Sequence, residues 1–323
     1  MSRAVAPLRD VSRDAPSGAV ASDAARWDAD TVELPLPRAV RAPRDAGAPL
    51  ELRAVARVIA EALGAPRPFD PGGLEARDPA TVRALLPLFR AIATRYLRAR
   101  IDGLENVTRG PALYVGNHSG GIMGPDLFCT LSALWGTLGP EAPLYAMAHD
   151  FAMRRLTPLG RVLQRVGALR AHPESARRAL RAGGSVLVYP GGDLDAYRAF
   201  WKRDRVVFGE RAGFVRVAQE AGVPIVPIVA QGAHRSALIV HEGEWLAEAL
   251  GLRRWSRIER FPLALSLPWI VGAGPWVPYL PLPFQVRVRV LPAVGVLRGA
   301  DAGVVQAQIV SQMQSALSSL ALG

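Results

Sequence analysis

The chain has 323 residues, half of them hydrophobic and 21% charged, a composition that excludes both a disordered chain and a polytopic membrane protein. Its single cysteine, Cys129, excludes an internal disulfide and a cysteine-based zinc site, so we expect a reducing, cytoplasmic setting. The formal net charge of +11 predicts an anionic partner, which nucleic acid, an anionic membrane or a phosphorylated small molecule would satisfy.

The N-terminal part of the chain shows two kinds of pattern. Residues 1–50 contain six prolines, one aromatic residue and no sustained apolar periodicity, so we expect a disordered tail. Residues 51–98 are predicted to be an amphipathic helical region, because segments 50–63 and 80–97 place apolar residues three or four positions apart. Its apolar faces suit packing on the following domain, and its arginines also suit contact with lipid headgroups.

From about residue 99 onward, short apolar runs alternate with helical patterns. The predicted strands are 112–115, 144–147, 168–170, 186–189 and 225–229, and the predicted helices are 126–138, 158–166, 174–181 and 211–221. This alternation predicts an α/β domain over residues 99–323, with a mostly parallel central sheet and helices on both faces. Ligands of such sheets bind beyond the carboxyl ends of the strands, so functional residues are expected there.

Residues 261–286 carry no charge but contain six prolines. The length would suit a transmembrane helix, yet each interior proline removes a hydrogen bond that lipid cannot replace. The sequence therefore favours either a buried irregular segment or an apolar surface at the bilayer interface. The second interpretation places Trp269, Trp276 and Tyr279 among the lipid headgroups.

The first polar cluster directly follows the predicted strand 112–115 and consists of Asn117, His118, Ser119, Gly120 and Gly121. An imidazole at a strand end, with an ordinary pKa near 6.5, can take a proton from a hydroxyl, which makes His118 a candidate general base. Asp126 opens the next helix, where it either orients His118 or stabilises its own helix N-terminus. The glycines permit a substrate to approach the backbone closely.

The second cluster ends the predicted strand 186–189 and consists of Tyr189, Pro190, Gly191, Gly192 and Asp193. Consecutive glycines leave backbone N–H groups available to an anion or a developing oxyanion, although an ordinary turn has the same composition. Basic residues gather downstream at Arg198, Lys202, Arg203, Arg205, Arg211 and Arg216. They suit a phosphate-rich ligand or an anionic membrane, which we favour over nucleic acid as the partner.

The chain contains four short sequence blocks in a characteristic order and spacing. They are Asn117-His118 and residues 167–170, 189–192 and 223–227. In this pattern the chain resembles the PlsC-like glycerolipid acyltransferases over about residues 100–295. The resemblance implies transfer of a fatty acyl group from acyl-CoA or acyl carrier protein to the hydroxyl of a glycerolipid. It also implies no bound cofactor, and a place at the cytoplasmic face of an anionic membrane.

The resemblance assigns His118 as general base on the acceptor hydroxyl and Asp126 as the acid that orients it. The family's aspartate follows its histidine at a shorter spacing, where this chain has Met123. Either the added glycines loop out and restore the geometry, or Asp150 replaces Asp126. The substrate contacts are assigned to Asn117, Ser119, Gly120, Gly121, Arg170, Tyr189, Pro190, Gly191, Gly192, Arg198, Lys202 and Arg205.

The second cluster departs from the members of the family that use a phosphate acceptor. Where those carry Pro-Glu-Gly-Thr-Arg, this chain reads Pro190-Gly191-Gly192-Asp193-Leu194. The glutamate and arginine that would hold a glycerol phosphate are absent, and Asp193 would repel it. We therefore expect a neutral or bulky lipid alcohol as acceptor, with Arg198, Lys202 or Arg205 as a displaced phosphate contact.

Two rival functions are weighed against this one. A catalytically inactive protein that binds lipid or membrane on the same fold is supported by the displaced aspartate. A lipid hydrolase finds no support, because the sequence contains no Gly-x-Ser-x-Gly elbow. Cys129 is expected in the core, and no metal site is predicted, because metal-ligand spacing is lacking among His149, His172, His234 and His241.

Overall fold

The computed structural model describes residues 52–64, 70, 72–150, 152–153, 157–256 and 258–322. The tail predicted over residues 1–50 lies outside the described residues. The described residues all fall within one compact unit of the chain.

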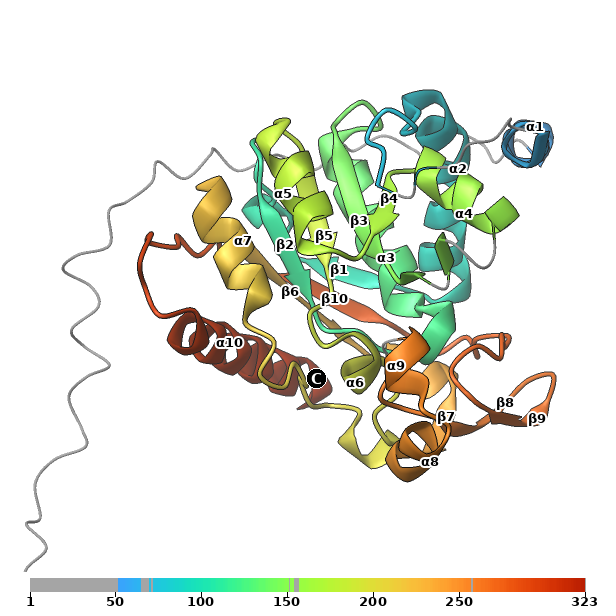
Figure 1. The fold of residues 1–323 in the computed structure, drawn as a ribbon. Helices are drawn as coiled ribbons and strands as arrows, with labels where there is room; N and C mark the ends of the chain where they lie inside the picture. The colour runs from blue at the N-terminus through green and yellow to red at the C-terminus, as the bar shows by residue number, and fades with distance from the viewer. Residues whose placement is uncertain are drawn as a thin grey trace, which may run out of the picture. The chain divides into compact units, whose positions relative to one another are not determined.

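A seven-stranded sheet forms the centre of this unit (Figure 1). Its strands are β1 (Arg100–Asp102), β2 (Leu113–Gly116), β3 (Leu144–Ala148), β4 (Ala168–Arg170), β5 (Ser185–Val188), β6 (Ile225–Gln231) and β10 (Arg287–Val290). The strand order is β1-β10-β6-β2-β5-β3-β4. The five strands from β6 to β4 are parallel, while β10 runs antiparallel to β6 and parallel to β1. The predicted mostly parallel α/β sheet is confirmed.

Helices cover both faces of the sheet, as predicted. The α-helices of the described ranges are α1 (Leu52–Gly64), α2 (Pro79–Ala91), α3 (Pro125–Leu138), α4 (Thr157–Arg165), α5 (Pro173–Arg181), α6 (Gly192–Ala196), α7 (Gly213–Ala221), α8 (Glu244–Ala249), α9 (Leu252–Ser256) and α10 (Ala302–Leu322). Successive residues of a strand point to opposite faces. Tyr114 of β2 accordingly packs in the core with α2 and α3, whereas Leu113 and Val115 pack with α5, α7 and α10.

The predicted amphipathic region supplies α1 and α2. The side chain of Asp78 caps α2 by accepting hydrogen bonds from the backbone N–H of Ala80 at 3.0 Å and of Thr81 at 3.2 Å. Val82, Leu85 and Leu86 are then buried against the sheet and α3. Packing on the following domain, one of the two roles expected for this region, is therefore the role of α2.

A second, three-stranded antiparallel sheet has the order β7-β8-β9. It consists of β7 (Leu238–His241), β8 (Leu263–Ser266) and β9 (Ile270–Ala273), so residues 261–286 form strands and loops instead of a helix. None of the helices in the described ranges is long and apolar enough to cross a membrane. The expected row of interfacial rings is corrected: Trp269 is 53% exposed, but Tyr279 is buried and Trp276 is half-buried.

Candidate active site

Asn117 anchors the chain as it leaves β2. Its Nδ2 donates to the carbonyl of Ala230 at 3.0 Å, and its Oδ1 accepts from the Ala230 N–H at 2.7 Å. This pair of hydrogen bonds ties the end of β2 to β6. The side chain is buried and its amide is taken up by the protein, contrary to the substrate contact expected from the sequence.

His118 and Asp126 form a hydrogen-bonded pair at this strand end. Nδ1 of His118 lies 2.9 Å from Oδ2 of Asp126, which also accepts from the Ser119 N–H at 3.1 Å. Asp126 lies in the first turn of α3 and is fully buried. Of the two carboxylates considered from the sequence, Asp126 is thus the one beside His118. Asp150 instead forms a two-bond ion pair with Arg170, at 2.5 Å and 3.1 Å.

The pair sets the protonation of the imidazole. Burial lowers the pKa of His118, but the charge of Asp126 and its hydrogen bond outweigh burial, and the pKa stands above its ordinary value. The hydrogen bond also holds Nδ1 as the protonated nitrogen of the neutral ring. The side chain is 22% exposed, and Nε2 makes no hydrogen bond within the described part of the chain. His118 is therefore arranged to accept a proton at Nε2.

Glycines in left-handed conformations allow the longer loop between His118 and Asp126. We call this segment, residues 119–125, the glycine loop. Gly120, Gly121 and Gly124 have φ values of 83°, 59° and 47°. A Cβ at Gly120 would lie 2.9 Å from the carbonyl oxygen of Ala233, and one at Gly124 would lie 3.3 Å from Cε1 of His118. The loop therefore turns tightly beside the imidazole and returns Asp126 to it, as the interpretation of a looped-out glycine pair requires.

Tyr189 covers one face of the imidazole. The two ring centroids lie 4.8 Å apart with an interplanar angle of 32°. This approach needs a glycine in the neighbouring strand, because a Cβ at Gly116 would lie 2.5 Å from the Tyr189 ring. Burial raises the pKa of Tyr189 well above its ordinary value, so the phenol stays protonated.

A buried ion pair holds the main chain of His118. Oδ2 of Asp195 accepts from the His118 N–H at 2.5 Å, and Nη1 of Arg198 donates to the His118 carbonyl at 2.6 Å. Oδ1 of Asp195 accepts from the same Nη1 at 3.0 Å. Burial raises the pKa of Asp195 to about 6 against the opposing charge of Arg198.

Arg198 has no nitrogen left for a substrate. Its Nε donates to the carbonyl of Lys202 at 3.0 Å, and Nη2 donates to Oγ of Ser119 at 2.7 Å and to the carbonyl of Arg203 at 2.8 Å. Its side chain is 1% exposed. The phosphate contact expected at Arg198 is therefore corrected to a role within the fold, and the same holds for the buried hydroxyl of Ser119.

His234 supports the same loop from the other side. Its Nδ1 accepts from the Gly120 N–H at 3.3 Å, and its Nε2 lies 2.6 Å from the carbonyl of Arg198. Burial and the charge of Arg198 lower the pKa of His234 to about 3, so the ring is neutral. Nothing in the local sequence around His234 indicates its contact with the glycine loop, because Gly120 lies 114 residues earlier in the chain.

The glycine turn after β5 differs from its expected role. The N–H of Gly192 donates to the carbonyl of Tyr189 at 3.0 Å, which removes it as a donor to an oxyanion. Asp193 pairs with Nη2 of Arg211 at 3.1 Å and accepts from the Glu259 N–H at 2.5 Å. Its charge is compensated, so repulsion of a substrate phosphate by Asp193 loses its basis.

The other predicted basic contacts lie at the surface. Nζ of Lys202 pairs with Oε1 of Glu242 at 2.7 Å, and its side chain is 51% exposed. Arg205 is exposed and forms no ion pair with a described residue. Lys202 and Arg205 thus remain accessible to an anion, unlike Arg198.

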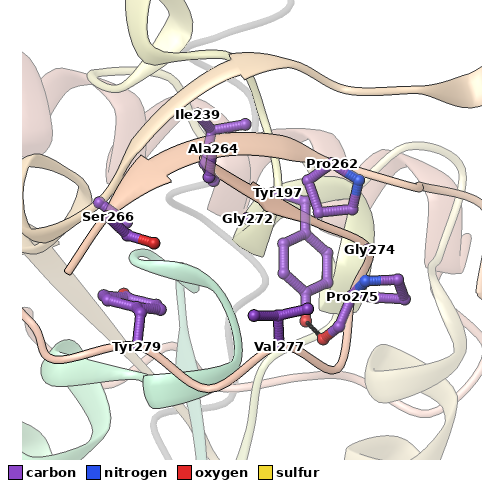
Figure 2. Close-up of a pocket in the computed structure, with 11 residues that line it drawn as sticks. Tyr197, Ile239, Pro262, Ala264, Ser266, Gly272, Gly274, Pro275, Val277 and Tyr279 are labelled. Atoms are coloured by element: carbon purple, nitrogen blue, oxygen red, sulfur yellow. Dashed lines mark hydrogen bonds between the residues drawn. The ribbon is translucent and has the colours of Figure 1, made fainter. Parts of the chain in front are cut away.

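A small apolar pocket lies between the glycine loop and the three-stranded sheet (Figure 2). Tyr279 donates to the carbonyl of Gly120 and lies 3.2 Å from Oγ of Ser236. The Tyr197 ring lies across the pocket, and its hydroxyl donates to the carbonyl of Pro275 at 2.5 Å. Because a Cβ at Gly121 would lie 3.1 Å from this ring, the pocket directly adjoins the loop that carries His118.

Comparison with known proteins relates part of this chain to one family. Residues 98–231 match the Acyltransferase family model. An uncharacterised protein of Mycobacterium tuberculosis is 29% identical over 203 residues, which cover 62% of this chain and 53% of that protein. The mouse DGAT1/2-independent enzyme synthesizing storage lipids is 26% identical over 131 residues, which cover 41% of this chain and 38% of that enzyme. The chain thus spans about half the length of the first of these relatives, and less of the second.

The fold also occurs among solved structures. The 1-acyl-sn-glycerophosphate (LPA) acyltransferase PlsC of Thermotoga maritima superposes with a TM-score of 0.50 at 13% identity, over 82% of this chain and 88% of that one. This likeness shows a shared fold. The part of the chain that matches the acyltransferase family model, residues 98–231, carries His118, Asp126 and strands β2 to β6.

Proposed function

We propose that the protein is an O-acyltransferase that moves a fatty acyl group from acyl-CoA or acyl carrier protein to the hydroxyl of a glycerolipid. Nε2 of His118 takes the proton of the acceptor hydroxyl, and the oxygen attacks the thioester carbonyl. The tetrahedral intermediate then expels the thiolate, which takes up the proton from His118. Ester and thiol are the products, and no covalent enzyme intermediate is needed.

The hydrogen-bonded pair of His118 and Asp126 carries this proposal. Asp126 holds the ring with Nε2 directed away from the carboxylate and stabilises the imidazolium that forms during transfer. The network of Asp195, Arg198 and His234 restrains the loop, so the base is preorganised before the substrate binds. These features favour a working catalytic centre over an inactive lipid-binding protein, which would have no need of a held base.

Accessible basic residues support a phosphate-bearing donor. Lys202 and Arg205 lie in the segment that follows α6, close in sequence to the residues that hold His118. We assign them to the phosphates of CoA or of the carrier protein's prosthetic group. Arg170 is a further candidate, although its guanidinium is paired with Asp150.

The acceptor is either a neutral acylglycerol or a lysophospholipid. The absence of the family's glutamate and arginine after Pro190 supports a neutral acceptor, as does the likeness to a mouse enzyme named for storage lipids. Because the fold is shared with an LPA acyltransferase, a phosphate-bearing acceptor is the alternative that the experiment must test. We further propose that the protein works at the cytoplasmic face of a membrane, since donor and acceptor would meet there.

The test is acyl transfer from a labelled long-chain acyl-CoA, or acyl carrier protein, to diacylglycerol, monoacylglycerol and lysophosphatidate in turn. We expect product from the wild type and a loss of at least a hundredfold in His118→Ala. His172→Ala is the matched control, because His172 is an exposed histidine on the N-cap of α5 and does not contact the pair. No product from either donor would favour the inactive lipid-binding protein, and strong preference for lysophosphatidate would overturn the neutral acceptor.

A further inference from the structure

The outer face of the three-stranded sheet is apolar where it meets solvent. Ala264 and Ser266 of β8 point inward and line the pocket (Figure 2), so Leu263 and Leu265 point outward and are 37% and 42% exposed. Val271 of β9 pairs with Leu265 and is 62% exposed. An antiparallel sheet with one solvated face normally carries polar residues on that face. This exposed face therefore carries apolar side chains where polar ones are expected.

The connections of the hairpin extend the same surface. Leu267 and Leu280 form an isolated bridge and are 48% and 55% exposed, while Trp269 and Ile270 at the turn are 53% and 73% exposed. We call this surface the apolar hairpin face, and it comprises Leu265, Leu267, Trp269, Ile270, Val271 and Leu280. A contiguous apolar surface of this kind on a folded domain marks a site of protein or membrane contact.

Arginines border this face without any acidic neighbour in the same segments. Tyr96 donates to the carbonyl of Pro281 at 2.6 Å, and Arg98 donates to that of Pro283 at 2.6 Å, so the end of the α2 region lies against the loop that follows Leu280. The N–H of Leu282 donates to the carbonyl of Ser236 at 3.1 Å and brings the neighbouring Arg235 to this border. Segments 90–100, 233–241 and 261–286 together contain five arginines and no acidic residue.

We propose that the apolar hairpin face inserts into the interface of an anionic bilayer, with Arg95, Arg98 and Arg235 on the lipid phosphates. Tryptophan and aliphatic side chains favour the boundary between headgroups and acyl chains, and neighbouring arginines add attraction to anionic lipid. A second copy of the chain is a poorer occupant, because two such faces brought together would place their arginine borders side by side.

This contact deepens the proposed function and rests on it for its purpose. The inner face of the same sheet lines the pocket that adjoins the glycine loop, and Tyr279 joins that loop through the carbonyl of Gly120. A bilayer bound to the outer face would therefore lie across one layer of sheet from the loop that carries His118. The thickness of this sheet would therefore determine how far His118 lies from the membrane surface.

A fluorescent label tests the contact without any need for catalysis. Cys129 is fully buried, so a polarity-sensitive thiol label on Ile270→Cys reports from the hairpin turn alone. Val304→Cys on α10 is the matched control, since Val304 is 55% exposed and lies outside the face. With vesicles of phosphatidylcholine and phosphatidylglycerol we expect a blue-shifted, brighter emission from the label at position 270 and none from that at 304.

Charge substitutions supply the second arm. Ile270→Glu combined with Val271→Glu should weaken sedimentation with these vesicles at least tenfold, whereas Val304→Glu should leave it unchanged. Equal binding by both variants, or an emission change at position 270 that follows protein concentration without vesicles, would overturn the proposal, the latter in favour of a second copy. His118→Ala should bind vesicles like the wild type, so loss of transfer with intact binding separates failure of the proposed function from failure of this one.

Discussion

Oδ2 of Asp195 accepts a hydrogen bond from the backbone N–H of His118 at 2.5 Å. The partner of that carboxylate, Arg198, donates to the carbonyl of the same histidine at 2.6 Å. One ion pair thus holds both polar groups of a single residue's main chain, and neither member touches the imidazole. Asp195 and Arg198 are therefore positioning residues, which act on the proposed base through its backbone.

Removing both members of this pair should cost less than the two single removals added together. Arg198→Ala leaves the charge of Asp195 buried without a counterion, so we expect a loss of about 3–5 kcal/mol in the free energy of unfolding. The double variant Asp195→Ala/Arg198→Ala should lose less than the sum of the single variants. Urea unfolding of the four proteins measures the coupling, and strict additivity would show that the pair does not act as a unit.

Asp126 should control the pH dependence of acyl transfer. It raises the pKa of His118, and the base acts only when neutral, so kcat/KM should rise as the pH passes that elevated pKa and level off above it. In Asp126→Asn the pKa of His118 should fall, which moves the acidic limb of the kcat/KM profile to lower pH. The plateau of kcat/KM should also fall, by a factor of about 10²–10⁴.

A matched aspartate provides the control for that profile. Asp193→Asn removes a carboxylate that pairs with Arg211 and does not contact His118, so its acidic limb should stay where the wild-type limb lies. An unchanged limb in Asp126→Asn would contradict the proposed coupling between Asp126 and the base.

Alanine substitutions at two glycines distinguish the effect of backbone strain on stability from the effect of site geometry on activity. Gly120 and Gly139 have φ values of 83° and 89°, but only Gly120 has neighbours within 4 Å of a Cβ placed there, at Pro125 and Ala233. Gly139→Ala should cost about 1–3 kcal/mol of stability and leave kcat unchanged, because a φ of 89° with a ψ of 157° is a conformation essentially confined to glycine. Gly120→Ala should cost more and also lower kcat, because the loop that carries His118 must shift. Thermal unfolding and kcat are measured on both variants, and an equal loss of kcat in the two would contradict a specific role for Gly120.

Charge reversal at Arg205 should act on donor binding. Arg205→Glu is expected to raise the KM for acyl-CoA several-fold with little change in kcat, and added salt should reduce the difference. Arg181→Glu is the control, since Arg181 is exposed at the end of α5 that leads into the start of β5, away from the carboxyl ends of the strands. Equal effects of the two substitutions would mean that overall charge, and not a contact at Arg205, matters.

The sequence predicts the parallel part of the sheet because buried parallel strands are continuous apolar runs, as in Val186 to Val188. Strands β1 and β10 escape prediction, since each is three or four residues long and contains arginine. Helix α10 had a usable signal, because its buried residues recur at helical spacing. They are Val305, Ile309, Met313, Leu317 and Leu320.

Candidate site residues can be predicted where their chemistry shows in the local sequence, but not where burial decides the role. His118 and Asp126 stand beside glycines after an apolar run, but the choice between Asp126 and Asp150 depends on the φ angles of the loop. Asp195 and Arg198 look like two more charges in a basic segment. Only the fold shows that they are enclosed together beneath His118, which also explains why Arg198 was assigned to a phosphate.

Strand β10 lies between β1 and β6, although its residues come long after both in the chain. During synthesis the edge of β6 therefore stays unpaired until residue 290 has left the ribosome, and β1 has no neighbour in the sheet before then. An open edge of this kind is prone to pair with other chains. A fragment confined to residues 98–231 would retain that open edge, so we expect it to aggregate more readily than a chain that includes β10.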